Sequence, residues 1–117
     1  MIKFLDLLWQ TRQVNDLSSA IERVLSSGVY IGGEEVENFE SQFSTYTKST
    51  YCHGVSNGQD ALRLSLVAAG IKSGDEVIVP AFTFIATWLA VSSIGAKIVP
   101  VDVHPTDLSI NAQLIKR

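Results

Sequence analysis

The first half of the chain alternates apolar and polar residues with a helical period. In residues 16–27 and again in residues 34–47, apolar side chains recur every three or four positions, which predicts an amphipathic helix over each range. Gly28 directly follows the first range and is typical of a helix C-terminus. Residues 28–33 hold three glycines, two aliphatic residues and a tyrosine. They predict a flexible loop that is not purely polar.

From residue 50 the pattern changes to strands and helices in alternation. The predicted strands are 51–56, 76–79 and 97–103, and the predicted helices are 58–69 and 82–94. Such a series predicts the α/β class, with a parallel sheet, right-handed crossovers and helices that cover the sheet. The apolar runs at 77–79 and 98–99 are continuous, as expected for strands buried on both faces. After a turn, Asn111 could cap a further helix beginning at residue 112.

Composition and charge exclude several classes of protein. The chain is 46% hydrophobic and 18% charged with a formal charge of −3, and its basic residues are scattered, so no basic stripe is available to nucleic acid. No apolar stretch approaches the ~18 residues of a membrane span, and no signal peptide is recognisable. The single cysteine, Cys52, excludes a disulfide-stapled secreted scaffold. We therefore expect a cytoplasmic protein without nucleic-acid or membrane partners.

The first candidate site is the junction between a strand and a helix at residues 55–61. Ligands of open parallel sheets bind beyond the carboxyl ends of the strands. Gly58 lets the backbone approach a ligand, and the amides of Gly58, Gln59 and Asp60 lack intrahelical acceptors, which suits a phosphate. The alternative is a simple cap, in which Ser56 or Asn57 closes the helix and Asp60 completes the arrangement.

The second candidate site is the junction at residues 80–87. Phe82 and Phe84 lie just beyond the carboxyl end of the predicted sheet, where an aromatic ring could lie flat on a planar cofactor. Core packing is the alternative for both phenylalanines. Trp88, four residues after Phe84, could belong to the core or could line the same pocket.

No metal site and no nucleotide-binding loop is predicted. His53 and His104 lie far apart, and neither has further ligands at metal-binding spacing. Asp102 could face a pocket or end its strand. The chain contains neither the dinucleotide-binding glycine pattern nor the P-loop.

Six short motifs occur in a characteristic order along the chain. They are residues 4–7 (FLDL), 27–33 (SGVYIGG), 36–40 (VENFE), 54–62 (GVSNGQDAL), 74–80 (GDEVIVP) and 83–87 (TFIAT). Together they resemble the amino-terminal part of the DegT/DnrJ/EryC1/StrS family of nucleotide-sugar aminotransferases. The resemblance implies the large domain of fold type I pyridoxal-phosphate enzymes, which are aspartate aminotransferase-like.

The resemblance also implies roles for three residues. Gly58 and Gln59 match the turn whose amides hold the phosphate of pyridoxal 5'-phosphate, and Phe84 matches the ring that stacks on the pyridine. Many members have threonine at the position of Gln59, so only the Gln59 amide is carried over. Residues 84–91 and 97–101 look most like members that act on dTDP-linked 3-keto-6-deoxyhexoses.

In this family a homodimeric enzyme transfers an amino group from glutamate to a nucleotide-linked keto-sugar, in lipopolysaccharide, O-antigen or other deoxysugar biosynthesis. The family's cofactor-binding lysine and its aspartate match no position here, so we expect no catalytic residue in this chain. We expect a fragment and a single partial domain, with leading helices and the glycine-rich loop in 1–49 and the start of the cofactor-binding sheet in 50–117. A dehydratase variant stays open. The alternative is a non-catalytic phosphate-binding or subunit-association module derived from the same fold.

Overall fold

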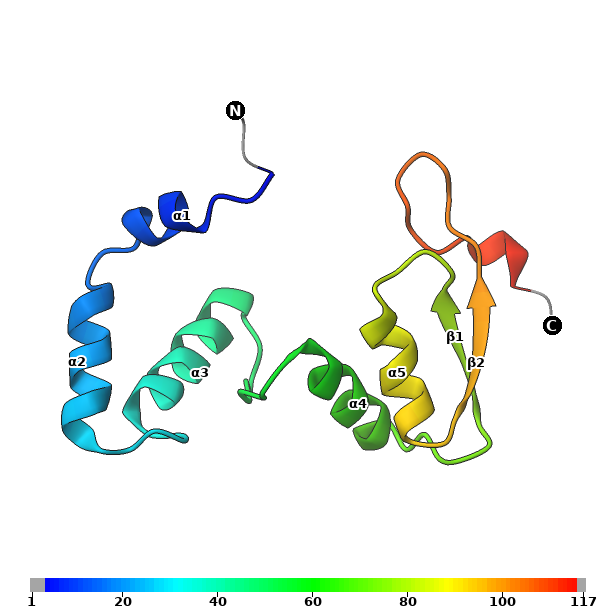
Figure 1. Cartoon of the computed structure of the whole chain (residues 1–117). Helices are drawn as coiled ribbons and strands as arrows, with labels where there is room; N and C mark the ends of the chain where they lie inside the picture. The colour runs from blue at the N-terminus through cyan, green and yellow to red at the C-terminus, as the bar shows by residue number, and fades with distance from the viewer. Residues whose placement is uncertain (1–3, 116–117) are drawn as a thin grey trace. The chain divides into compact units, whose positions relative to one another are not determined.

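A computed structural model describes residues 4–115 of the chain (Figure 1). Contacts between residues divide the chain into two compact units, Met1–Gly54 and Val55–Arg117. The sequence predicts one partial domain, with leading helices in 1–49 and the start of the sheet in 50–117, and this stays a prediction. Each unit is described separately below. None of the helices among residues 4–115 has the length and apolar character needed to cross a membrane.

The first unit is helical. It contains α1 (Leu7–Gln13), α2 (Leu17–Ser27) and α3 (Glu34–Thr47). The helices predicted over 16–27 and 34–47 are confirmed as α2 and α3. Gly28 ends α2 with a φ of 68°, a left-handed conformation that glycine adopts without strain.

Helix α1 was not among the predicted elements. Its seven residues are too few for a hydrophobic period to stand out. The usable signal is its cap, because the Asp6 carboxylate accepts a hydrogen bond from the Trp9 amide at 3.0 Å.

Surface contacts hold the first unit together. The Arg23 guanidinium lies 2.7 Å from the Glu35 carboxylate, which links α2 to the first turn of α3. The rings of Phe39 and Phe43 stack along α3 with centroids 5.5 Å apart. None of the three helices contains a buried residue.

The strand predicted over residues 51–56 is wrong. The structure has no strand or helix over residues 50–55, and the Gly54 amide donates to the Glu40 carboxylate at 2.7 Å. The same carboxylate lies 3.5 Å from Nδ1 of His53. The backbone bond that a sheet would make is here made to a side chain, since no neighbouring strand is present in the described first unit.

The second unit contains a small parallel sheet. Its elements are α4 (Gly58–Ala68), β1 (Glu76–Pro80), α5 (Ile85–Ser93), β2 (Lys97–Val101) and a 3-10 turn, η1 (Ala112–Leu114). Strands β1 and β2 pair in parallel, with Glu76 opposite Lys97 and Pro80 opposite Val101. Figure 1 shows the two arrows side by side and pointing the same way. The predicted β1–α5–β2 alternation is confirmed.

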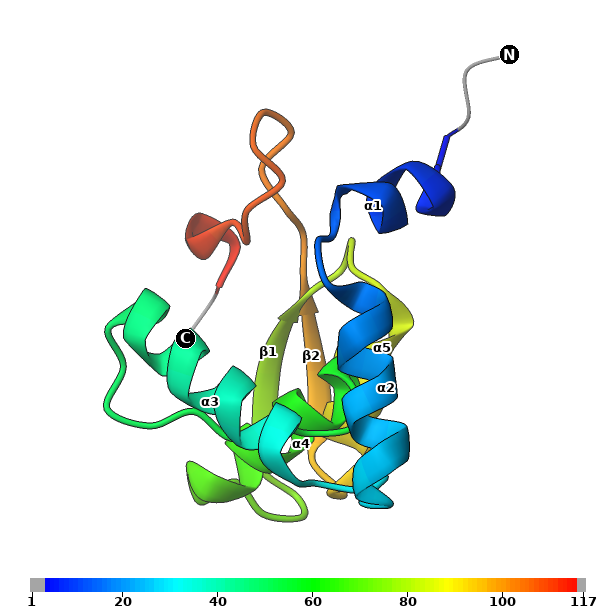
Figure 2. The ribbon, with the colours of Figure 1, turned by 90° about the vertical axis from the view of Figure 1, so that its left-hand side faces the viewer.

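The core of the second unit lies between α5 and the sheet. Val79 of β1, Val91 of α5 and Ala96 form the buried cluster, and Leu66 and Trp88 are among the partly buried residues that pack against it. Figure 2 shows α5 beside β1 and β2 from a second direction. This cluster fixes the position of α5 relative to the carboxyl ends of both strands.

The expectation that both faces of the strands are buried is wrong for β1. Val79 is buried, but Ile78 is 42% exposed. Helix α5 covers one face. On β1, Ile78 lines an open hollow of about 460 Å³, together with Val99 of β2 and the late residues Leu114 and Ile115. An apolar run therefore indicates a strand here without indicating that the described chain covers both of its faces.

Three elements differ from the predictions by more than a one-residue shift at an end. Helix α5 begins at Ile85 rather than residue 82, because Phe84 is extended with φ −69° and ψ 142°. Strand β2 ends at Val101, and Val103 instead forms an isolated antiparallel bridge with Ile110. The segment after Asn111 is a 3-10 turn rather than the start of an α-helix. Asn111 does cap it, accepting from the Gln113 amide at 3.1 Å.

Candidate functional site

The N-terminus of α4 combines a cap with free backbone donors. Asn57 is extended, and its side-chain oxygen accepts a hydrogen bond from the Asp60 amide at 2.9 Å. The capping alternative is therefore confirmed. The cap uses the Asp60 amide, so two of the three amides expected as donors are left: helix geometry gives those of Gly58 and Gln59 no intrahelical acceptor. The cap and an anion site can coexist on this turn.

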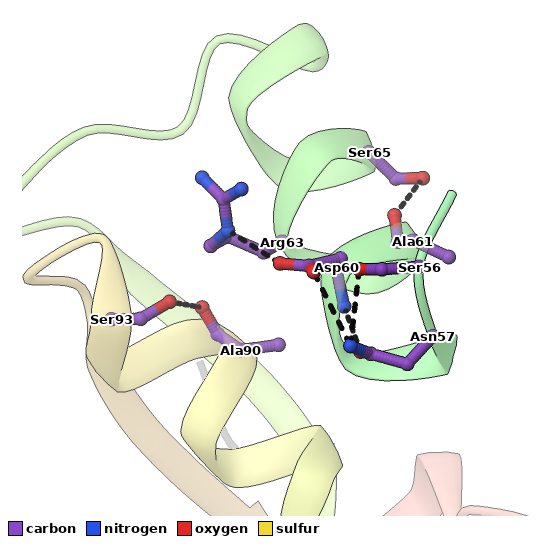
Figure 3. Close-up of polar contacts among 8 residues, drawn as sticks. All are labelled: Ser56, Asn57, Asp60, Ala61, Arg63, Ser65, Ala90 and Ser93. Carbon is purple, nitrogen blue, oxygen red and sulfur yellow. Dashed lines mark hydrogen bonds and ion pairs between the residues drawn. The ribbon is translucent and has the colours of Figure 1, made fainter. Parts of the chain in front are cut away.

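The Asp60 carboxylate is held by its own neighbours (Figure 3). It accepts hydrogen bonds from the Ser56 hydroxyl, from the Asn57 amide nitrogen at 3.3 Å and from the Arg63 guanidinium at 3.2 Å. The bonds from Ser56 and then Arg63 lower the pKa of this carboxyl below its ordinary value. Arg63 offsets the negative charge that would otherwise oppose an anion beside the Gly58 and Gln59 amides.

The three site residues predicted from the sequence line one hollow. It has a volume of about 460 Å³, and its walls include Gly58 and Gln59 at the start of α4 and Phe84 before α5. Four further residues line it: Asn57, Leu62, Ala86 and Thr87. Asp60 is not among the lining residues. The structure thus brings the two predicted junctions together within the second unit.

The phenylalanines differ in their relation to this hollow. Phe84 lines it and is 78% exposed, whereas Phe82 is 69% exposed and does not line it. Core packing is therefore wrong for both rings in the described chain. For Trp88 the core alternative is confirmed, because it is half-buried against the core cluster and does not line the hollow.

Sequence reasoning missed Thr87. It lines the hollow, and its hydroxyl lies 2.9 Å from that of Thr83. The available signal was its spacing, since a residue three positions after Phe84 lies on the same side of the first turn of α5. Other sequence candidates play no part here: residues 4–115 contain no group of three metal-ligating side chains, and Asp102 accepts a hydrogen bond from the adjacent Val103 amide.

The donors and surfaces of the hollow suit a flat ligand with an anionic end. Two backbone amides at a helix N-terminus favour a phosphate, and an exposed ring favours an aromatic plane. A Cβ added to Gly58 would meet no heavy atom within 4 Å, so the space beside this residue is open to a ligand. The volume lies in the range of small-molecule sites.

Comparison with known proteins gives this geometry its context. Residues 12–117 match the DegT/DnrJ/EryC1/StrS aminotransferase family. The chain belongs to this family. The resemblance drawn from the six motifs is thereby confirmed.

Relatives and solved structures agree on the family. The chain is 44% identical over 117 residues to the dTDP-3-amino-3,4,6-trideoxy-alpha-D-glucose transaminase of Streptomyces venezuelae, covering 99% of this chain and 31% of the relative. It superposes with a TM-score of 0.91 and 45% identity on S. venezuelae DesV in complex with a ketimine intermediate, covering 97% of this chain and 31% of that one. A GDP-4-keto-6-deoxymannose-3-dehydratase with a trapped PLP-glutamate geminal diamine matches with a TM-score of 0.76 and 33% identity, over 86% of this chain and 28% of that one.

These matches establish the fold and the extent of the likeness. The chain has the α/β fold of the amino-terminal part of fold type I aminotransferases, as expected. It spans about a third of the length of the transaminase that it resembles. The family's cofactor fits the donor set described above, because pyridoxal phosphate joins a phosphate to a planar aromatic ring.

Proposed function

We propose that this chain forms part of the cofactor site of a pyridoxal-phosphate-dependent aminotransferase. The enzyme would transfer an amino group from glutamate to a nucleotide-linked keto-sugar. The observation that carries this proposal is the hollow that Gly58, Gln59 and Phe84 line together. Membership of an aminotransferase family supports the same conclusion independently of the geometry.

Four residues of the hollow have a defined task in this proposal. The Gly58 and Gln59 amides bind the phosphate, helped by the positive end of the α4 dipole. Phe84 stacks on the pyridine ring and holds its plane. Asn57 keeps the first turn of α4 in shape through its bond to the Asp60 amide. When bound, pyridoxal phosphate supplies the electron sink that amino transfer requires.

The substrate class rests on relatives and on sequence likeness. The Streptomyces venezuelae relative is named for a dTDP-linked 3-amino-deoxysugar. Residues 84–91 and 97–101 are the segments that look most like enzymes of dTDP-linked 3-keto-6-deoxyhexoses. We extend the proposal to such a sugar as acceptor, with glutamate as donor, in deoxysugar or lipopolysaccharide biosynthesis. A cytoplasmic homodimer belongs to the same proposal.

A transaminase is favoured over a dehydratase and over a non-catalytic module with the same fold. Identity to the transaminase is 44%, against 33% to the dehydratase. The alternative of a non-catalytic phosphate-binding or subunit-association module is not favoured, because the matching family is one of aminotransferases.

A chimera tests the proposal directly. Residues 1–117 replace the matching segment of the S. venezuelae transaminase, so that the residues of this chain act beside a complete catalytic apparatus. We expect the chimera to bind pyridoxal phosphate, seen by absorbance, and to transfer the amino group of glutamate to a dTDP-keto-sugar. A chimera that unfolds cooperatively like its parent but binds no cofactor would show that the hollow does not serve this purpose.

Gly58→Val in the chimera tests the phosphate position. A Cβ at residue 58 would meet no heavy atom within 4 Å, so a branched side chain there begins in open space beside the hollow. We expect at least about tenfold weaker cofactor binding, because the phosphate loses its approach to the amides. Ser65→Val is the matched control, since it adds a branched side chain to the same helix outside the hollow. Equal affinities for the two variants would contradict the assignment.

A further inference from the structure

The loop that carries Phe84 leaves the sheet at a peptide group that is bonded on both sides. The Ala81 amide donates to the Val101 carbonyl of β2 at 2.8 Å. The carbonyl of the same peptide belongs to Pro80, and it accepts a hydrogen bond from the indole nitrogen of Trp88 at 3.1 Å. The peptide plane at the start of the loop is therefore fixed from two directions.

Planarity explains why the indole is needed for this. In a trans peptide the N–H and the C=O point to opposite sides, and residues 4–115 contain no cis peptide bond. Because the Ala81 N–H points to β2, the Pro80 carbonyl points away from it. Strand β2 is the only neighbour of β1 in the described residues, so no strand on the other side donates a hydrogen bond to the Pro80 carbonyl. The Trp88 indole is its donor instead.

Trp88 is itself firmly placed. It lies on α5 and packs against the cluster of Val79, Val91 and Ala96. At the far end of the loop, the Thr83 and Thr87 hydroxyls meet at 2.9 Å and the Thr87 amide donates to the Phe84 carbonyl at 3.1 Å. The loop between β1 and α5 is therefore held at both ends by α5, and the ring of Phe84 is 78% exposed with few contacts of its own.

We propose that Trp88 is a positioning residue for Phe84. Its indole N–H fixes the Pro80 carbonyl, the carbonyl sets the course of the short loop, and the loop places the ring at the hollow. The nature of the ligand rests on the proposed function. The contact with Pro80 and its effect on the loop do not, so the two can fail separately.

Two variants remove the N–H with different costs to packing. Trp88→Phe removes the donor and part of the ring. Benzothienylalanine at residue 88, introduced by semisynthesis or codon expansion, keeps the two-ring shape and replaces the N–H by sulfur, so it leaves the core filled. Ile94→Val is the control, because Ile94 packs on the same cluster at the end of α5 away from the loop.

The first measurement is amide hydrogen exchange in the full 117-residue chain. Both Trp88 variants are expected to speed exchange of the Ala81 amide about fivefold and to shift the Phe84 ring resonances, since one hydrogen bond of ordinary strength is lost. Ile94→Val is expected to change neither. Unchanged Ala81 exchange in the benzothienylalanine variant would overturn the proposal, whatever the ligand.

The second measurement compares two ligands in the chimera. Pyridoxamine 5'-phosphate has the phosphate and the ring but no aldehyde, so its affinity reports non-covalent contacts, and inorganic phosphate reports the α4 amides alone. Both Trp88 variants are expected to bind pyridoxamine 5'-phosphate about fivefold more weakly and phosphate unchanged. Equal weakening of both ligands would assign Trp88 a general structural role and overturn the proposal. If the unsubstituted chimera bound neither ligand, the proposed function would fail, and the Ala81 exchange would still decide the role of Trp88.

Discussion

The two units of the chain are stabilised in different ways. Residues of α1, α2 and α3 bury no side chain, and their contacts include capping bonds, stacked rings, the exposed Arg23–Glu35 pair and the bond from the Gly54 amide to Glu40. The second unit has a core, in which Val91 is 2% exposed and Val79 is 3% exposed. All lining residues of the candidate site belong to the second unit. The difference teaches that this site is positioned by a small buried cluster, so its geometry depends on few residues.

The sharpest way to break this contrast is to place a charge in each unit. Val91→Asp puts a carboxylate into the core, and we expect a loss of at least about 3 kcal/mol of unfolding free energy. Ile21→Asp makes the same type of change on α2, where the side chain is 52% exposed. We expect little effect there. Thermal unfolding followed by circular dichroism, with amide exchange resolved by unit, measures both, and similar losses would contradict the comparison.

A glycine pair sharpens the contrast within the second unit. Gly95 has a φ of +75°, and an added Cβ would lie 2.7 Å from the Ser73 hydroxyl oxygen. Gly70 has a φ of +85° with nothing within 4 Å. We expect Gly95→Ala to cost about 2 kcal/mol or more, and Gly70→Ala about 1 kcal/mol, since only the first adds a clash to the backbone strain. Chemical denaturation of the two variants should reproduce this order, and the reverse order would show that the turn can move.

The cap of α4 is expected to have a smaller effect on stability. Asn57→Ala leaves the Asp60 amide without its acceptor and should cost about 1 kcal/mol. Asn57→Ser restores an acceptor at the cap and should recover most of that loss. Denaturation midpoints give both values. If Asn57→Ala were neutral, the first turn of α4 would not depend on its cap.

The smallest expected effect concerns pH. Hydrogen bonds to Ser56 and Arg63 lower the pKa of Asp60 in the folded chain, so its ionised form favours folding. This stabilisation is present above the ordinary pKa of 3.8 and is lost as the pH falls through the lower folded-state value. Asp60→Asn should therefore weaken the fall in stability below about pH 4 and leave its slope near neutrality unchanged. Parallel acid unfolding curves for the two proteins would show that Asp60 is not involved.

The sequence predicted the parts of the fold that repeat a pattern. The helical spacing in 34–47 predicted α3 to the residue, and the β-branched runs located β1 and β2. Helix α1 was not predicted because its seven residues span only about two helical turns, too few for the pattern to repeat clearly. The segment 51–56 looked like a strand, but a strand needs a neighbour, and here the Gly54 amide is bonded by Glu40.

The candidate site was predictable as far as local chemistry reaches. The glycine and amide pattern at Gly58 and Gln59 and the ring at Phe84 were named from sequence, and the hollow contains all three. The contact between Trp88 and Pro80 was not, because it depends on the rotation of α5 over the sheet. The sequence allowed a cap or a phosphate site at this turn. The Asn57 cap uses the Asp60 amide, and helix geometry gives the Gly58 and Gln59 amides no intrahelical acceptor.

The two prolines of the sheet have a consequence for association between chains. The Ala81 amide and the Val101 carbonyl both face the space between the strands, so the preceding residues, Pro80 and Pro100, have their backbone nitrogens on the outer edges of β1 and β2. A proline nitrogen carries no hydrogen, so each outer edge lacks one donor at this level. An extended segment of another molecule would find its ladder of hydrogen bonds interrupted on either side. The short sheet is therefore a poor template for intermolecular strand addition.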